Sequence, residues 1–89
     1  MSALDLLGRR WTLRVLWELR DEALTFRALR ARCDAMSPSV LNQRLRELLE
    51  SGLVEIDPDG GYRLAAAGRD LLRALAPLRA WATRWARSW

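Results

Sequence analysis

The twelve residues SPSVLNQRLREL, at positions 37–48, decide the fold of this chain. Ser37 followed by Pro38 is typical of a helix start, because serine caps free N–H groups and proline fits the first helical position. The helix is predicted to run from Pro38 to about Ser51, with leucines at helical spacing along one side. That buried side consists of Leu41, Leu45 and Leu48. The opposite side is polar and carries Ser39, Asn42, Gln43, Arg46 and Glu50.

The segments before and after this helix predict a winged helix-turn-helix. Upstream, Thr25 caps a shorter helix, and its buried face carries Phe26, Leu29 and Cys33. Downstream, Gly52 ends the second helix. Two short β-prone runs then flank a Pro/Gly turn at 57–61, which is typical of a hairpin.

The predicted fold is therefore mainly α with a small β-hairpin, and it forms one domain over residues 1–89. Its helix-turn-helix covers about 25–51, its wing about 53–64 and a long C-terminal helix about 66–89. Pro77 lies inside that last helix and is expected to kink or split it, because proline removes a backbone hydrogen bond. A chain of 89 residues and 10.2 kDa has room for a single core only.

The two ends of the chain are apolar enough to predict a homodimer. Residues 2–7 are predicted to form a short helix that ends at Gly8, and the helix predicted over 10–19 is apolar nearly all round, so it needs cover on more than one side. Three of the five tryptophans lie along one edge of the C-terminal helix. We expect the N- and C-terminal helices to form an isologous interface. Its candidate residues are Leu4, Leu7, Trp17, Leu78, Trp81, Trp85 and Trp89.

The same tryptophans allow a second interpretation, an aromatic pocket for a small planar effector between the subunits. An interface can contain such a pocket, so the two interpretations are compatible. Cys33 also allows two interpretations. It is expected to be a small core residue, and the alternative is a redox thiol activated by the neighbouring Arg30 and Arg32.

The composition favours nucleic acid as the partner. All fifteen basic residues are arginine, against eleven acidic residues, which gives a net charge of +4 and a pI near 10.9. Arginine suits phosphates and guanine edges, although a GC-rich genome also produces an arginine bias.

Other functions lack the residues they need. The absence of histidine and of a glycine-rich nucleotide motif argues against an enzyme, and one cysteine without histidine excludes a zinc site within one chain. No cofactor is expected. No apolar run or signal peptide predicts a membrane or export, so the expected location is the cytoplasm, at the nucleoid.

The polar side of the second helix is the predicted surface for double-stranded DNA, because that helix of the motif enters the major groove. The candidates for base contacts are Ser39, Asn42, Gln43 and Arg46. The candidates for contacts to the DNA backbone are Arg27, Arg30, Ser37, Arg44 and Arg63. The turn at 57–61 is acidic, and phosphate repels it, so the wing is expected to contribute little.

Several stretches of the chain are similar to segments of one protein family. LDLLGRRWTL at 4–13 resembles the opening "L-D-L-[IL]-G-G-K-W-T-L", and FRALR at 26–30 resembles "F-x-E-L-R". Residues 37–48 resemble "S-x-K-x-L-[ST]-x-R-L-R-E-L" and are followed by the matching GLV. The later YRL, Gly68, Leu78 and Trp81 fit "E-Y-x-L-T-x-x-G" and "L-x-x-W". The chain thus resembles the HxlR-type winged-helix transcriptional regulators of bacteria.

This resemblance implies a homodimer that binds a pseudo-palindromic operator, with the terminal helices in contact. Family members that sense electrophiles or oxidants use a cysteine ahead of the position of Leu4, and no cysteine precedes Leu4 here. We therefore expect a sequence-specific regulator, and specifically a repressor. The alternative is a winged-helix dimer that binds protein or small molecules and has weak or lost DNA recognition.

Overall fold

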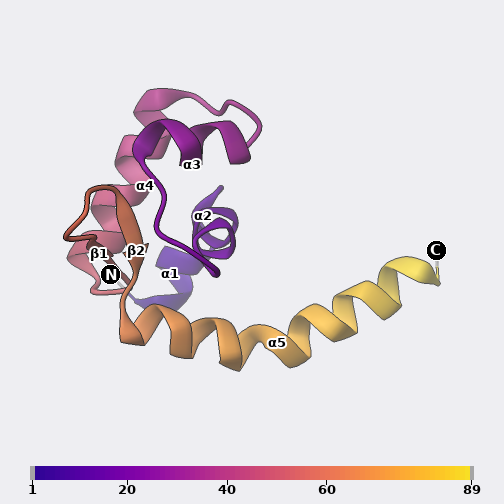
Figure 1. Ribbon diagram of the computed structural model, residues 1–89. Coiled ribbons are helices and arrows are strands. Elements are labelled where there is room, and N and C mark those ends of the chain that lie inside the picture. The colour runs from indigo at the N-terminus through magenta and orange to yellow at the C-terminus, as the bar shows by residue number, and fades with distance from the viewer. Residues whose placement is uncertain (1, 89) are drawn as a thin grey trace.

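The computed structural model describes residues 2–88, as five helices and two strands (Figure 1). In chain order they are α1 (Ala3–Leu7), α2 (Thr12–Glu18), α3 (Phe26–Arg32), α4 (Pro38–Glu50), β1 (Val54–Ile56), β2 (Tyr62–Leu64) and α5 (Ala66–Arg87). This is the predicted winged helix-turn-helix order. In the part of the chain that the structure describes, no helix is long and apolar enough to cross a membrane.

Helix α2 forms the centre of the molecule and contacts α1, α3, α4 and α5. Val15 and Leu16 on α2 are fully buried, together with Leu29 of α3 and Leu41 of α4. The prediction that this helix needs cover on more than one side is confirmed, although the helix is shorter than the predicted range 10–19. The apolar interior fixes how the other helices are arranged around α2.

The hairpin pairs β1 with β2 in antiparallel register, with Val54 opposite Leu64. A third segment joins it, since Leu24 and Tyr62 exchange backbone hydrogen bonds of 2.8 and 2.9 Å. Gly61 has φ +85° and lies so close to this segment that a Cβ would meet the Leu24 carbonyl oxygen at 2.6 Å. Only glycine fits there, because it has no side chain and adopts positive φ freely. This close approach ties the wing to the start of the helix-turn-helix.

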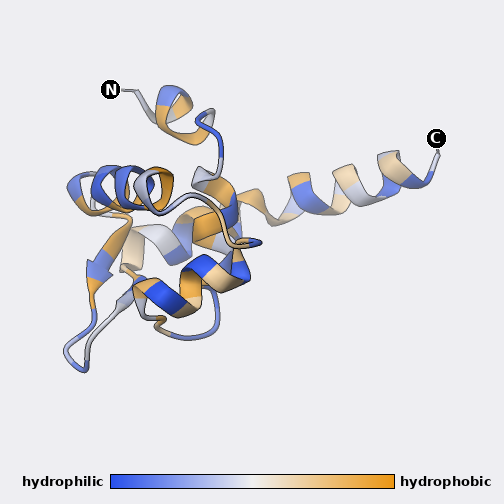
Figure 2. Cartoon of the chain, turned by 90° about the horizontal axis from the view of Figure 1, so that it is seen from above, coloured by the Kyte–Doolittle hydropathy of each residue, from blue (hydrophilic) through white to orange (hydrophobic). Residues whose placement is uncertain are grey.

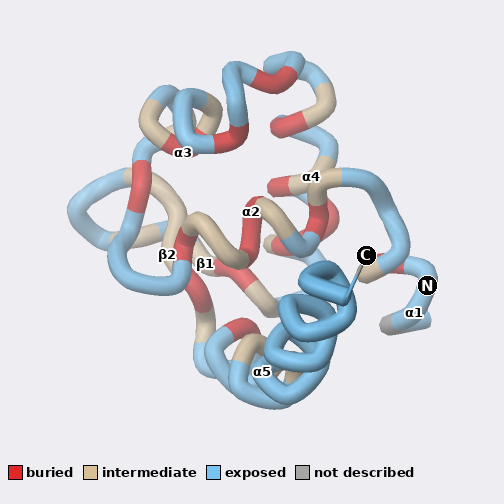
Figure 3. The backbone as a smooth tube through the Cα atoms, turned by 90° about the vertical axis from the view of Figure 1, so that its right-hand side faces the viewer, coloured by how far each residue is buried: buried red, intermediate tan, exposed pale blue. Residues whose placement is uncertain are grey.

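Helix α5 runs uninterrupted through Pro77 and bends near its middle in Figure 1, so of the two predicted outcomes, a kink or a split, the structure shows the kink. Its first half packs near α2 and β2, and its second half extends away from the compact part of the molecule (Figures 1 and 2). Residues 76–88 are all exposed, which Figure 3 shows as a pale blue helix. The far half of α5 is therefore only lightly covered by the described residues of its own chain, through the contact of Arg79 with Trp17.

Candidate nucleic-acid interface

The polar side of α4 is uncovered. Ser39, Asn42, Gln43 and Arg46 are all exposed. On the opposite side of the helix, Leu41, Leu45 and Leu48 are 0–2% exposed. The predicted division of this helix into a buried apolar side and a bare polar side is confirmed, and the four base-contact candidates share one surface.

The start of α4 differs from the prediction in one detail. Ser37 occupies the N-cap position and Pro38 the first turn, but the Ser37 side chain makes no capping hydrogen bond to the backbone. Its hydroxyl lies 2.9 Å from the Ser39 hydroxyl instead. By contrast, Thr25 does cap α3, since its hydroxyl accepts a bond of 3.1 Å from the Ala28 N–H. The predicted N-cap position of Ser37 and first-turn position of Pro38 are confirmed, but the expected capping hydrogen bond is not formed, because the Ser37 hydroxyl bonds with Ser39 instead.

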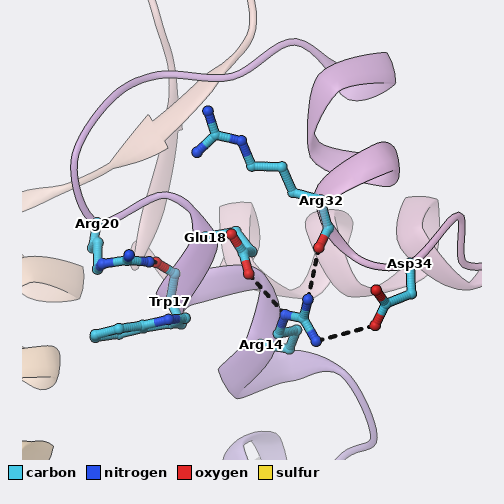
Figure 4. Close-up of polar contacts among 6 residues, drawn as sticks. All are labelled: Arg14, Trp17, Glu18, Arg20, Arg32 and Asp34. Carbon is cyan, nitrogen blue, oxygen red and sulfur yellow. Dashed lines mark hydrogen bonds and ion pairs between the residues drawn. The ribbon is translucent and has the colours of Figure 1, made fainter.

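The turn between α3 and α4 is held by Arg14 of α2 (Figure 4). From α2, Arg14 donates to Glu18 at 2.8 Å, to Asp34 at 3.3 Å and to the Arg32 carbonyl at 2.7 Å. The bond to Glu18, together with the negative charges of Asp34 and Glu18, raises the pKa of Arg14 above its ordinary value. Asp34 and Ala35 lie in the turn with φ of +58° and +54°. The angle between α3 and α4 is thus fixed by both charge and backbone conformation.

The five candidates for DNA-backbone contacts lie in different surroundings. Arg27 and Ser37 are exposed, and among the described residues no ion pair is recorded for Arg27. Arg30 is half-buried and donates to the Met36 carbonyl at 2.7 Å, so it holds the turn. Arg44 is only 16% exposed and pairs with Glu47 at 3.1 Å. The geometry therefore supports a phosphate contact at Arg27 and Ser37 more than at Arg30 or Arg44.

In the wing, Arg63 is held by the wing's own carboxylates. Its guanidinium pairs with Glu55 at 2.7 Å and with Asp57 at 3.3 Å, and the bond to Glu55 raises the pKa of Arg63. Asp57 also accepts a bond of 3.0 Å from the Asp59 N–H at the tip. A wing with three carboxylates and one arginine is acidic, as the sequence predicted, and Arg63 has to leave its partners to reach a phosphate.

Glu47 is the residue of this region that sequence reasoning missed. It lies on α4 beside the polar side, yet it is only 7% exposed and pairs with both Arg9 and Arg44 at 3.1 Å. The i,i+3 spacing to Arg44 is visible in the sequence and indicates that pair. The pair with Arg9 depends on how the α1–α2 turn packs against α4, which no local pattern reveals.

The candidate interface residues divide into exposed and packed positions. Leu4 is 83% exposed, and Leu78, Trp81 and Trp85 are 50–55% exposed. The Trp81 and Trp85 rings stack with centroids 5.9 Å apart. The other three candidates are not open surface positions: Leu7 packs against the core, Trp17 is half-buried, and Trp89 lies outside the described residues.

Trp17 is packed within its own chain rather than left free for a partner. The guanidinium groups of Arg20 and Arg79 lie over its ring at 3.8 and 3.6 Å. Trp17 also lines a groove of about 390 Å³ between α2 and α5, beside Leu13, Leu75 and Leu78. Only the edge of Trp17 that faces this groove is therefore open to a partner.

Cys33 is fully buried in the core. Burial raises the pKa of its thiol, and this effect outweighs the opposing effect of the nearby Arg14 charge. Both observations agree with the expected core role, because a reactive cysteine needs an exposed thiolate. Within residues 2–88 no group of three or more potential ligand side chains could hold a metal ion.

Comparison with known proteins gives a consistent picture. Residues 6–88 match the family described as HxlR-like helix-turn-helix. The chain is 32% identical over 90 residues to the HTH-type transcriptional regulator YvaP of Bacillus subtilis (strain 168), covering 99% of this chain and 83% of YvaP. It is 40% identical over 85 residues to the HTH-type transcriptional regulator Rv3095 of Mycobacterium tuberculosis (strain H37Rv), covering 89% of this chain. That match spans 53% of Rv3095, or about half of the mycobacterial relative.

Solved structures show the same architecture. Quinone-bound YodB from B. subtilis superposes with a TM-score of 0.84 at 30% identity, over 93% of this chain and 92% of that one. A possible HxlR family transcriptional factor from Thermoplasma volcanium GSS1 gives a TM-score of 0.85 at 27% identity, over 98% and 84% of the two chains. The fold described above is thus shared along nearly the whole chain.

Proposed function

Since the chain belongs to the HxlR-like helix-turn-helix family, it is a DNA-binding transcriptional regulator and not an enzyme, and we propose that the polar side of α4 reads its operator. In this proposal Asn42 and Gln43 suit adenine, Arg46 suits guanine, and Ser39 adapts to either, all from within the major groove. The single observation that carries the proposal is the exposure of all four side chains while the other side of α4 is closed by the core.

These side chains are also free to adjust to base edges. The one hydrogen bond recorded between them runs from Arg46 to Gln43 at 3.4 Å, which is long for such a bond. Exchanging it for contacts to bases costs little. Arg27 and Ser37, at either side of the turn, are the proposed phosphate contacts, while Arg30, Arg44 and Arg63 contribute less because protein groups already hold them.

We propose that the protein acts as a homodimer on a pseudo-palindromic operator. The exposed apolar residues of α5 and Leu4 of α1 supply the surface for the second copy. Two copies of α4 then enter successive major grooves about 34–36 Å apart. A dimer bound across a promoter blocks access to it, so we propose repression as the outcome, with the nucleoid of the cytoplasm as the place of action.

Selection of binding sites from a library of randomised duplexes tests this proposal. We expect an enriched sequence with two inverted half-sites, about 10–10.5 bp apart from centre to centre. The binding constant for the enriched duplex, measured by gel shift, should fall steeply with salt. A plot of its logarithm against the logarithm of the salt concentration should have a slope of about −0.9 for each phosphate contact. If no sequence is enriched and random duplexes bind as well as any other, the proposal of operator recognition is wrong and the alternative, a protein- or ligand-binding dimer, takes its place.

A small planar effector at the interface is a second proposal, favoured by the groove between α2 and α5. Its walls combine Trp17 with leucines, and the structurally similar YodB has been solved with a quinone bound. Naphthoquinone is a suitable planar probe. We expect it to quench tryptophan fluorescence and to release the enriched duplex, and to do neither in the variant Trp17→Leu.

A further inference from the structure

The α1–α2 turn and the recognition helix α4 are joined by a buried carboxylate. Among the described residues, Thr12 and Glu47 are the polar side chains classed as buried, and Glu47 carries the charge. One oxygen of Glu47 pairs with the Arg9 guanidinium at 3.1 Å, and the other pairs with Arg44 at the same distance. Each oxygen therefore has a separate cation, one from outside α4 and one from within it.

Arg9 belongs to a turn whose backbone is fixed at several points. Its N–H donates to the Leu6 carbonyl at 3.2 Å, and its carbonyl accepts from Thr12 at 3.3 Å. Trp11, next to it, has φ +77°, a left-handed conformation that costs a non-glycine residue about 1–2 kcal/mol. The turn is thus held in a specific, strained shape, and Arg9 extends from it to α4.

The leucine contacts set which side of α4 is buried, but they hold its finer rotation only loosely. Its buried side consists of leucines, and apolar contacts have no directional preference. The ion pair between Glu47 and Arg9 adds a contact between two defined points, one on α4 and one on the α1–α2 turn. Glu47 directly follows Arg46 and lies one helical turn after Gln43, so any constraint on Glu47 acts on the residues proposed to face the bases.

We propose that Glu47 is a positioning residue for DNA recognition. Through Arg9 it holds α4 in the rotation that presents Asn42, Gln43 and Arg46 to base edges, and it ties that rotation to the α1–α2 turn. Arg44, on α4 itself, supplies the second positive charge for the buried carboxylate. This inference rests on the proposed function of α4. Stability is not its main purpose, because a buried ion pair contributes little net stability once the loss of hydration is counted.

The test compares Glu47→Gln with Asp70→Asn on the enriched duplex and on a shuffled duplex of the same composition. Asp70 is a 79% exposed carboxylate on α5, outside the proposed reading surface, so both variants lose one negative charge. We expect Glu47→Gln to lower the ratio of specific to non-specific affinity about fivefold or more, as for the loss of a coupled network. Asp70→Asn should leave that ratio within about twofold of the wild type.

Arg9 supplies a second pair of variants that does not leave a buried charge alone. Arg9 is 43% exposed, and Glu47 keeps Arg44 when Arg9 is removed, so Arg9→Gln should fold even if Glu47→Gln does not. We expect Arg9→Gln to reduce the affinity ratio and Arg9→Lys, which can still donate to Glu47, to retain it. An unchanged ratio in Arg9→Gln, or equal losses in both Arg9 variants, overturns the positioning role. If the wild type itself fails to discriminate, the proposed function fails and the inference fails with it.

Discussion

Two helices of this protein leave a side uncovered, and the two sides differ in chemistry. Helix α4 exposes serine, amide and guanidinium groups, whereas the far half of α5 exposes Leu78, Trp81 and Trp85 at 50–55%. Water solvates the polar side of α4 well, so that side is stable without a partner. The apolar side of α5 is poorly solvated, and burying the rest of each indole, roughly 100 Å², would contribute about 2–3 kcal/mol.

This difference indicates two kinds of partner. A polar surface can exchange water for DNA and return to water, which suits a reversible contact. An apolar surface of this kind gains from lasting cover, which suits a second copy of the chain. The bend of α5 and its extension beyond the compact part, seen in Figure 1, leave the apolar side free to meet an identical helix. We therefore expect α5 to be covered at all times and α4 only when DNA is bound.

The largest expected effect comes from placing charge on the apolar side of α5. In the double variant Trp81→Glu, Trp85→Glu, the dimer dissociation constant should rise about 1,000-fold or more, because buried tryptophans at interfaces are each worth about 2 kcal/mol or more. Analytical ultracentrifugation measures the change. Thr83→Glu is the matched control, since Thr83 lies between the two tryptophans in sequence but on the other side of the helix. A double variant that stays as dimeric as Thr83→Glu shows that α5 is not the interface.

A second experiment sharpens the contrast between the closed core and the open end of α5. Burial raises the pKa of the Cys33 thiol, so less thiolate is present at a given pH than in an unfolded chain. Iodoacetamide at pH 8 should modify Cys33 at least about 100-fold more slowly in the folded protein than in urea, because reaction requires local opening. An added cysteine, Ser88→Cys, at the exposed end of α5 should react at the rate of a free thiol. Comparable rates at the two positions would contradict a closed core.

The raised pKa of Cys33 also sets how stability depends on pH. The unfolded thiol ionises at a lower pH than the buried one, so the folded state holds its proton more tightly. Any stability linked to Cys33 is therefore fully present below the ordinary thiol pKa and is lost as the pH rises towards the raised value. Denaturant melts of the wild type and of Cys33→Ala, compared across this range, measure it.

Alanine should have different effects at Arg46, the proposed base contact on α4, and at Arg27, the proposed phosphate contact on α3. Arg46→Ala should lower affinity for the enriched duplex about tenfold, the usual value of a good base contact, with a smaller loss on shuffled DNA. Arg27→Ala should weaken both duplexes equally and reduce the log–log salt slope by about 0.9. Equal losses on both duplexes for Arg46→Ala would remove its proposed role as a base contact.

The sequence predicts α4 and α5 well, because in each helix the apolar residues recur at helical spacing along one side. Leu41, Leu45 and Leu48 recur at helical spacing, so the helical repeat alone shows which residues form the polar side of α4. The hairpin follows from its glycines and proline, and burial of Cys33 from its place on the Phe26 side of α3. Each of these features depends on residues close together in the chain.

The features that the sequence does not reveal depend on where distant segments meet. Arg9 meets Glu47 only after α1 and α2 have packed beside α4, and Trp17 is covered by Arg79 only because α5 crosses α2. Leu24 joins the hairpin although nothing near it signals a strand. The i,i+3 spacing of Arg44 and Glu47 indicates a pair but not its burial, and for this reason the sequence predicts a phosphate contact at Arg44 although its side chain is only 16% exposed.

The smallest expected effect concerns the turn that sets α4 against α3. Ala35 has φ +54°, a conformation that glycine adopts without the steric cost an alanine bears. Ala35→Gly should therefore raise the free energy of unfolding by about 0.5 kcal/mol, after the greater freedom of glycine in the unfolded chain is subtracted. Ala31→Gly, within α3, should lower it by about 0.5–1 kcal/mol, because glycine weakens a helix interior. Urea melts of both variants compare the signs, and a loss of stability in both would mean that Ala35 is not strained. If Ala35→Gly gains stability and binds the operator with unchanged affinity, the backbone of the turn positions α4 and the methyl group of Ala35 is not needed for it.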